Sequence, residues 1–598
     1  MKASFHLLLL LLLLGSRLPA QHQQWFKTIP PITEDTPAWA ALMYGENPNL
    51  REVDSAYQAY YRAHQFERNT HTQNYQHWRR KVEPFLDARG YIQWPSPMQR
   101  RQEEELYRRQ LSREPALRQP GPWEQVGPFE TFNKGEGQFE VSWQANVYTV
   151  DQADADPSVL YCGTESGGVY KSTDSGQHWS HASANTMMGN IRIVRISPHN
   201  PQVVYAGDGS RVYRTTDGGG NWEVALDAAD LGLNGLGINA IALSPADEER
   251  VIAGGQQGLW YSADGAQSWQ QQFSSPVYDI EFKPGSPLTL YLVRGNTAEK
   301  RCEFLKSTDG GESWEVKEEG WYQPPGPSYD GLSDGGAKIA VSSLNPDLVL
   351  AGLIGNSKPE DDGYLGLWRS QDAGETWTLL GPHIGGPYEY SGGPATHKNV
   401  MKNEGGGGPY QGFYDYVLGI SPFDADIVYI GGVSLFKSAD GGATFNVIGG
   451  YQGNTWVHPD MQEITTGPDG LWLATDGGVD FSDDEFTTVE SRKWGISASE
   501  FWGFGSAWNE DLVVGGRYHN GNTAIRPSFG QGQSLRLGGG EAPTGYINPG
   551  GRGVAYFSDI SSQLIPWELS GEALGLPKLQ LYPSESYFAA HSSELEFA

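Results

Sequence analysis

From Trp123 onward, hydrophobic residues occur in short runs that are bounded by glycine and polar turn residues. One phrase recurs, a small turn followed by an apolar run and glycine, as in SPHNPQVVYAG, SPADEERVIAGG and SPFDADIVYIGG. Short apolar runs between turn signals predict β-strands rather than helices. Each recurrence holds four such runs in about 45 residues, a period typical of a repeat architecture.

A second motif, Ser/Thr-x-Asp-x-Gly-x-x-Trp, marks the same period. It reads KSTDGGESWE at 306–315, and its six aspartates are Asp174, Asp217, Asp264, Asp309, Asp372 and Asp440. Successive aspartates are 43, 47, 45, 63 and 68 residues apart. Four strands per unit at this spacing predict the blades of a β-propeller. We expect each aspartate to accept hydrogen bonds within its own turn, with Gly311 at positive φ and Trp314 buried, so its role is structural.

Later units are degenerate. The segment PDGLWLATDGGVDFSDDEFTTV keeps Ser482 and Asp484 but has Phe486 and Val489 where glycine and tryptophan belong. Two further units, WNEDLVVGGRYHNGNTAIR and NPGGRGVAYFSD, lack the aspartate motif. The predicted fold is an all-β propeller, either seven-bladed with part of a second or a single ring of about ten blades. The last residues resemble an unfinished blade, so we expect truncation at the C-terminus.

The N-terminal region has a different pattern. Residues 1–20 combine Lys2 with a short leucine run and read as a signal peptide cleaved between Ala20 and Gln21, which predicts a secreted or surface protein. Residues 21–119 show helical spacing, with Asn49 as a candidate helix cap. Residues 120–598 form the predicted propeller region.

The charge of the predicted propeller region disfavours some classes of binding partner. Residues 120–598 hold 60 acidic and 26 basic residues, an excess that disfavours nucleic acid and anionic membranes as partners. No apolar run is long enough to span a bilayer, so membrane insertion is not expected. No metal-binding or cofactor-binding motif occurs, so neither metal nor cofactor is expected. Cys162 and Cys302 lie in separate repeats and are expected as buried thiols rather than a disulfide.

Candidate functional residues fall in loops expected on the face opposite the aspartate turns. Paired carboxylates suit glycoside hydrolysis, and the candidates are Glu165, Asp476 and Glu541. The other candidates for the ligand face are His458, Asp460, Arg517, His519, Asn520, Tyr546, Trp321 and Tyr388. Alternatives stay open, because carboxylates can face the channel by chance, His458-x-Asp460 lacks a third metal ligand, and HNGN is also a turn sequence.

The repeats resemble the secreted Asp-box, or BNR-repeat, β-propeller family. The phrases GTESGGVYKSTDSGQHW, QGFYDYVLGISP and LATDGGVDFS are similar to sortilin-like and xyloglucanase-like exported proteins of Bacteroidetes, often described as glycosyl hydrolase-like. The xyloglucanase resemblance implies a catalytic Asp in a loop of the first blade. Here the matching loop, TESGG, has Glu165 instead, while Asp476 occupies a TDGG loop in a later blade.

Two functions follow as expectations. The first is an exported propeller that binds a polysaccharide or a protein through its loop-rich face, with Trp321, Tyr322, Tyr388 and Tyr390 as exposed aromatic contacts. The alternative is a glycoside hydrolase, xyloglucanase-like or sialidase-like, that uses paired carboxylates on that face.

Overall fold

The computed structural model describes residues 26–575, except 27–28, 31, 35, 67–68, 95–97, 100–101, 103–105, 107–125, 134–142, 297, 300, 324–335, 355–363, 382–411, 413, 452, 454, 509, 540–544, 549–552, 558–561 and 572. The chain forms two compact units, Met1–Gln110 and Leu111–Ala598. The domain limits predicted at residues 20 and 119 stay predictions. Among the described residues, none of the helices has the length and apolar character needed to cross a bilayer.

The first unit is a small helical domain. It contains α2 (Ala38–Met43), α3 (Leu50–Ala63), α4 (Thr70–Val82) and the 3-10 helix η2 (Glu83–Phe85). Asn49 caps α3, because its Oδ1 accepts hydrogen bonds from the backbone N–H groups of Arg51 and Glu52. Trp39 and Trp78 lie in its buried aromatic core. The predicted cap and helical character are therefore confirmed.

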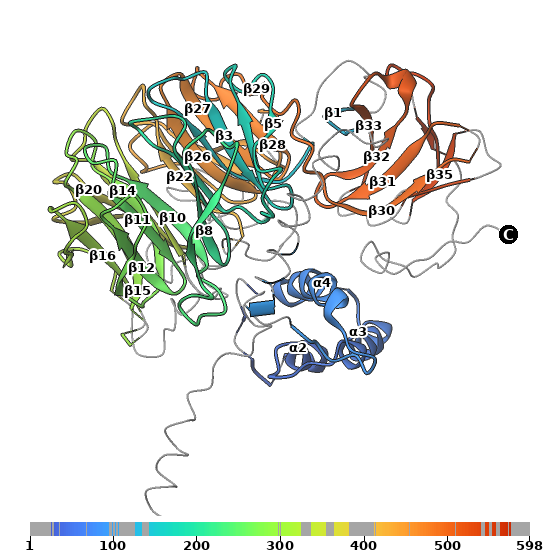
Figure 1. Cartoon of the computed structure of the whole chain (residues 1–598), viewed down its shortest axis with the longest axis horizontal. Helices are drawn as coiled ribbons and strands as arrows, with labels where there is room; N and C mark the ends of the chain where they lie inside the picture. Colours follow the sequence, from blue (N-terminus) through green and yellow to red (C-terminus); the bar gives the residue numbers. More distant parts are fainter. Residues whose placement is uncertain are drawn as a thin grey trace, which may run out of the picture. The chain divides into compact units, whose positions relative to one another are not determined.

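Within the described part of the second unit, the strands from β2 to β29 form seven four-stranded antiparallel sheets, each built from four consecutive strands (Figure 1). In the first sheet, Val150 lies opposite Cys162, which lies opposite Tyr170. The first four sheets comprise β2 (Val147–Gln152), β3 (Leu160–Thr164), β4 (Val169–Ser172) and β5 (Ser180–His181); β6 (Ile193–Ile196), β7 (Val204–Gly207), β8 (Arg211–Thr215) and β9 (Glu223–Asp227); β10 (Ile238–Leu243), β11 (Val251–Gly255), β12 (Gly258–Ser262) and β13 (Gln270–Phe273); β14 (Val277–Phe282), β15 (Leu290–Asn296), β16 (Arg301–Ser307) and β17 (Glu315–Val316).

The remaining three sheets of this set follow the same plan. They comprise β18 (Gly336–Val341), β19 (Val349–Ile354), β20 (Tyr364–Ser370) and β21 (Thr378–Gly381); β22 (Val417–Ile420), β23 (Val428–Gly431), β24 (Leu435–Ser438) and β25 (Asn446–Gly449); β26 (Met461–Gly467), β27 (Gly470–Thr475), β28 (Gly478–Ser482) and β29 (Glu490–Ser491). We number these seven sheets as blades 1 to 7 in chain order.

The seven blades close into a ring. The first strand of each blade lies beside the first strand of the next, and β26 of blade 7 lies beside β2 of blade 1. Hydrogen bonds seal this junction: the Trp472 indole donates to Gln152 Oε1 (3.0 Å), and the Trp179 indole donates to the Arg492 carbonyl (2.8 Å). The chain is thus a seven-bladed propeller with a further module, and the alternative of one ring of about ten blades is wrong.

Apolar side chains fill every junction between neighbouring blades. Seven separate clusters of buried residues occupy these junctions, and one of them joins blade 7 to blade 1. Cys162 and Cys302 lie buried in two different clusters as free thiols, as predicted. Since each blade buries both of its faces against neighbours, loss of one blade would expose an apolar face on each of two others.

The second module follows the ring. One sheet contains β30 (Phe501–Ser506), β31 (Val513–Arg517), β32 (Gly521–Ile525), β33 (Gln533–Gly538) and, parallel to β33, the distant β1 (Glu130–Phe132). The 3-10 helix η4 (Pro527–Phe529) connects β32 to β33. The next sheet contains β34 (Gly545–Ile547), β35 (Val554–Phe557), β36 (Gln563–Leu564) and β37 (Leu574–Gly575). These sheets match the two predicted units that lack the aspartate motif.

The repeated motif forms one turn, between the third and fourth strands of each blade. In blade 4, the Ser307 hydroxyl donates to Asp309 Oδ1 (2.8 Å) and accepts from the buried Gly311 N–H (2.8 Å). The Asp309 carboxylate also accepts from the backbone N–H of Ser313 (2.9 Å). Gly311 has a φ of 91°, which favours glycine, whereas Trp314 is half-buried. The serine and aspartate thus satisfy donors that a tight turn leaves without strand partners.

The seventh blade forms the same turn despite its degenerate sequence. The Phe486 N–H donates to Ser482 Oγ (2.8 Å), and Thr488 donates to Asp484 through its N–H and its hydroxyl. Glu485 and Phe486 take φ values of 65° and 57°, where glycine is usual. Such a conformation costs a non-glycine residue about 1 kcal/mol or more, so the surrounding hydrogen bonds hold it.

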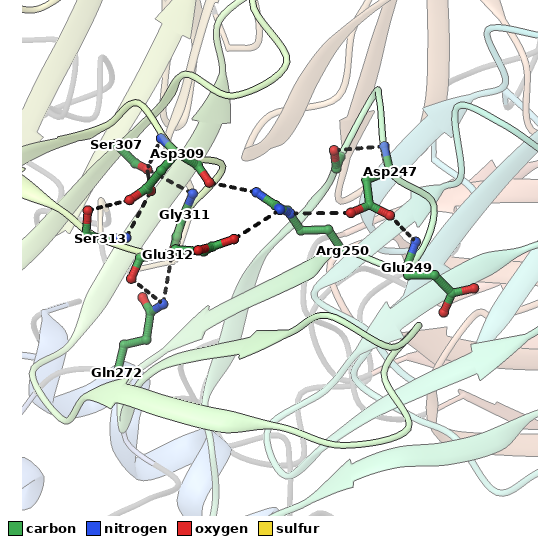
Figure 2. A network of polar contacts seen from close by, with 10 residues as sticks. Asp247, Glu249, Arg250, Gln272, Ser307, Asp309, Gly311, Glu312 and Ser313 are labelled. Atoms are coloured by element: carbon green, nitrogen blue, oxygen red, sulfur yellow. Dashed lines mark hydrogen bonds and ion pairs between the residues drawn. The ribbon is translucent and has the colours of Figure 1, made fainter.

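Basic side chains join several of these turns to the preceding blade. Arg250 of blade 3 donates to the Asp309 carbonyl (2.8 Å) and pairs with Glu312 (3.2 Å) in blade 4 (Figure 2). Three other junctions use the same device: Lys171 donates to the Gly218 carbonyl, Lys437 to the Glu485 carbonyl and Arg492 to the Ser175 carbonyl. The turn therefore contributes both to its own blade and to the packing of that blade against the preceding one.

We predict that Ser307→Ala lowers the free energy of unfolding by about 1–3 kcal/mol, because the buried Gly311 N–H loses its acceptor. Ser313→Ala is the matched control, since Ser313 is exposed and its backbone contact with Asp309 persists. Urea denaturation followed by circular dichroism measures both variants. Equal losses for the two substitutions would contradict this account.

We also predict acid sensitivity of the ring. The side-chain and backbone hydrogen bonds of Asn221 lower the pKa of Asp217 to about 2, and those of Ser268 do the same for Asp264. A carboxylate with a lowered folded pKa stabilises the fold above its unfolded pKa, about 3.9, and this contribution is lost as the pH falls towards 2. The urea midpoint should therefore fall between pH 4 and pH 2. An Asp217→Asn/Asp264→Asn double variant should show a smaller fall in urea midpoint over this range. A fall as large as that of the wild-type protein would refute the assignment.

Candidate functional site

Two candidate carboxylates lie at equivalent ends of neighbouring blades. Glu165 follows β3 in blade 1, and Asp476 follows β27 in blade 7. Both positions are loops between second and third strands, at the strand ends away from the aspartate turns. His458 and Asp460 precede β26, while His519 and Asn520 lie in the turn from β31 to β32. Residues from the ring and from the second module therefore meet at one site.

Asp476 is the centre of this site. Its carboxyl group is fully buried and contacts three side chains. The Tyr414 hydroxyl lies 3.0 and 2.9 Å from the two carboxyl oxygens, Gln462 Nε2 donates to Oδ1 (2.8 Å), and His519 Nδ1 lies 3.0 Å from Oδ2. Burial, with the nearby charges of Asp460 and Glu165, raises the pKa of Asp476 well above its usual value. The protonated form of this carboxyl group is therefore favoured relative to a carboxyl group in water.

Glu165 is linked to Asp476 through two amides. Asn146 Nδ2 donates to Glu165 Oε2 (2.8 Å), and Asn520 Nδ2 donates to Asn146 Oδ1 (3.1 Å) and to the Asp476 carbonyl (2.9 Å). Glu165 is half-buried, so its carboxylate is partly open to solvent. The two carboxyl groups thus have different surroundings, as an acid and a base require.

Two tyrosines, which the sequence analysis did not single out, complete the site. Tyr414 precedes β22, and its ring stacks on that of His519 at 5.7 Å between centroids. Burial and the charges of Asp476, Tyr148 and Glu165 raise the pKa of Tyr414 well above its usual value. Tyr148 on β2 lies under the Arg192 guanidinium, 4.2 Å from its ring centroid. The phrase QGFYDYVLGISP contains Tyr414, but an isolated tyrosine before a strand gave no signal of function.

Three of the candidate residues could hold a cation. Donor atoms of Asp460, Asp476 and His519 all lie within 4.8 Å of one another. Two carboxylates and an imidazole suit a divalent ion such as Zn²⁺ or Mn²⁺. The sequence offered no third ligand for this group, because His519 reaches it from the second module. His458 itself is buried, and burial lowers its pKa to about 3.

Of the remaining predicted residues, Arg517 is joined to the site through the Asn520 carbonyl (3.2 Å), whereas Trp321 and Tyr322 lie elsewhere. Trp321 and Tyr322 were expected as exposed aromatic contacts, and this expectation is wrong. Both are buried between blades 4 and 5, where the Trp321 indole donates to the Cys302 carbonyl (2.9 Å). Tyr546 is half-buried on β34, and Arg517 is fully buried at the end of β31. Glu541, Tyr388 and Tyr390 lie outside the described residues.

No protein-family model matches the chain. A xyloglucanase of Paenibacillus sp. is 23% identical over 315 residues, which span 50% of this chain and 26% of that protein. The photosystem II assembly lipoprotein Ycf48 of Synechococcus sp. (strain CC9902) is 28% identical over 148 residues, 24% of this chain and 41% of that protein. The chain thus matches well under two thirds of either relative.

The crystal structure of an ancestral GH74 enzyme is similar in fold, with a TM-score of 0.52. The similarity covers 76% of this chain and 63% of that one, at 15% sequence identity. These comparisons confirm the β-propeller fold.

We predict that Asp476→Asn leaves the protein folded and about as stable as wild type at pH 7, whereas Asp476→Ala costs about 2–4 kcal/mol. The alanine variant leaves Tyr414, Gln462 and His519 facing a cavity, while asparagine preserves their contacts. The raised folded pKa of Asp476 gives stability below its unfolded pKa that is lost as the pH rises. The free energy of unfolding of the asparagine variant, measured by urea denaturation, should therefore rise relative to that of the wild-type protein between pH 5 and pH 8. A large loss in Asp476→Asn at pH 8 would show that the ionised carboxylate is required.

Proposed function

We propose that this chain is part of a glycoside hydrolase that cleaves an extracellular polysaccharide at the site around Glu165 and Asp476. The observation that carries this proposal is the convergence of Glu165, Asp460 and Asp476 around Tyr414, whose pKa responds to all three charges. Similarity to a xyloglucanase and to a GH74 fold supports the same reading. The binding function favoured by the sequence has less support, since two of its expected aromatic contacts are buried.

In the proposed reaction, one of the two carboxyl groups acts as general acid and the other as nucleophile or general base. Asp476 would supply the proton for the leaving oxygen, because its burial and the nearby charges of Asp460 and Glu165 raise its pKa. It is fully buried, so the proton would pass through Tyr414 or His519, both of which contact it and are partly exposed. Glu165, held by Asn146, would act as the nucleophile or as the base that activates water.

The surroundings of the site suit a sugar chain. Trp456 lies two residues before His458 in the connection to β26 and exposes 73% of its surface. An exposed indole offers a flat apolar surface on which a sugar ring can stack. We propose that Trp456 contacts the polysaccharide beside the carboxyl groups.

Two finer assignments belong to the same proposal. We assign the repeated turn to the Asp-box type, on the hydrogen bonds that Ser307 and Asp309 make in blade 4. We also propose export after cleavage between Ala20 and Gln21, which agrees with an extracellular polysaccharide as substrate.

The test is release of reducing ends by residues 21–598 from xyloglucan, glucuronoxylan and pectin. We expect release from at least one of them, reduced by about a hundredfold or more in kcat in Glu165→Gln, because a directly acting carboxylate is lost. Glu248→Gln, which changes an exposed glutamate in the turn before β11, is the matched control and should retain full activity. Circular dichroism confirms that each variant is folded.

Two outcomes would contradict the proposal. Activity that survives Glu165→Gln would place the chemistry elsewhere. Absence of release by the folded wild type, together with retention on one polysaccharide in affinity electrophoresis, would favour a binding function.

A further inference from the structure

Two arginines of the second module project from the same face of one sheet. Gly515 lies opposite Thr523, and Thr523 lies opposite Arg536 on β33. Directly opposed residues share a face of a sheet, and Arg517 is two residues beyond Gly515 on β31. Arg517 and Arg536 therefore lie on one face of this sheet.

Neither guanidinium meets a carboxylate in the part of the chain that the structure describes. Arg517 is fully buried and donates to three neutral oxygens, Thr131 Oγ1 (3.1 Å), the Gln144 carbonyl (3.4 Å) and the Asn520 carbonyl (3.2 Å). Arg536 donates to the Gly539 carbonyl (3.2 Å). The Nε atom of each arginine is buried without a hydrogen-bond partner.

Several well-shielded arginines elsewhere are paired with acids. The described examples are Arg195 with Glu463 (2.8 Å), Arg211 with Asp227 (3.0 Å), Arg294 with Glu303 (2.9 Å) and Arg526 with Glu510 (2.7 Å). Buried charges need a partner, because removal from water is costly for an isolated ion. The protein has a formal net charge of −30, so acidic side chains are abundant, yet none of those described pairs with these two arginines.

Arg517 and Arg536 carry like charges, which makes their burial together more costly in free energy. Burial, and next the neighbouring charge of Arg536, lowers the pKa of Arg517 to about 9. Burial lowers the pKa of Arg536 to about 10. Both values remain above neutral pH, so two positive charges stand close together without an opposite charge from the described residues.

The second arginine is also positioned for a ligand. Arg536 is half-buried, and its guanidinium carbon lies 3.7 Å from the centroid of the half-buried Trp143 ring. Stacking on an indole fixes the plane of a guanidinium and leaves its N–H edge free to form paired hydrogen bonds. A planar carboxylate matches that edge, since its two oxygens accept from two parallel N–H groups.

We propose that Arg517 and Arg536 form an anion subsite that takes the carboxylate of a uronic-acid residue in the polysaccharide substrate. This inference rests on the proposed function, because it places the acidic sugar beside the reacting bond. The connection is short: Arg517 donates to the Asn520 carbonyl, and Asn520 donates to the carbonyl of Asp476. Arg536 makes the direct contact, and the fully buried Arg517 contributes its charge.

The test is isothermal titration of residues 21–598 with sodium glucuronate, glucose and sodium sulfate. Glucuronate should bind and raise the melting temperature, while glucose at the same concentration should do neither. Arg536→Gln should weaken glucuronate binding by about tenfold or more, since a charge-assisted pair of hydrogen bonds is lost. Arg536→Lys, which keeps the charge but not the planar edge, should give an intermediate affinity.

Controls separate this inference from the hydrolase proposal. Glu165→Gln should retain glucuronate binding even where hydrolysis is lost, because the proposed subsite does not use the Glu165 carboxylate. Arg214→Gln changes an arginine of β8 that pairs with Glu223, and it should also bind glucuronate normally. Arg536→Gln without ligand should be at least as stable as wild type, because removal of one of two like charges relieves repulsion.

Four results would overturn the subsite. The first is equal binding of glucose and glucuronate, and the second is unchanged glucuronate affinity in Arg536→Gln. The third is tighter binding of sulfate than of glucuronate, which would assign the pair to a tetrahedral anion instead of a sugar carboxylate. Hydrolysis without glucuronate binding would likewise refute the subsite and leave the proposed enzyme intact.

Discussion

The structure depends on the hydrogen bond between a buried backbone N–H and the hydroxyl of the first residue of each aspartate turn. In blade 4 this is the bond from Gly311 to Ser307, and in blade 7 it is the bond from Phe486 to Ser482. The turn fixes where the third strand ends and the fourth begins, and the outer edge of each blade follows from it. Because the blades bury their faces against one another, a defect in one turn also affects its neighbour, as the contact of Arg250 with the Asp309 carbonyl illustrates.

The opposite face is free for function because the aspartate turns hold the blades together on their own side. The loops that follow the second strands lack the aspartate motif, so their sequences can differ between blades. Blade 1 presents Glu165 there and blade 7 presents Asp476, and ring closure makes these two blades neighbours. The second module adds His519 and Asn520 to the same place. Distant parts of the sequence thus supply one polar cluster.

Most of the fold could be predicted from the sequence, because the sequence repeats. Each copy of the turn predicts the two strands around it, and Asp484 was recognisable although Phe486 replaces glycine, since serine and aspartate make most of the bonds. Ring closure could not be predicted. The contact between Trp472 and Gln152 joins the last blade to the first, and it has no local sequence signature.

The candidate site was readable in part. Glu165 and Asp476 were found because they occupy equivalent positions of the repeat. Tyr414 was missed, because only the folded ring brings it to Asp476. Trp321 and Tyr322 were misread, because the loop-like sequence that follows them suggested exposure, whereas large aromatic rings in a blade connection gain more by filling the junction between blades.

The most direct measurement is a crystal structure of Glu165→Gln with an oligosaccharide of the polysaccharide that the wild-type protein retains or cleaves. The account predicts a glycosidic oxygen within about 3 Å of Gln at position 165 or of the Tyr414 hydroxyl, with the sugar chain on the loop face of blades 1 and 7. An oligosaccharide bound at the face that carries the aspartate turns, or away from the Asp476 cluster, would contradict it.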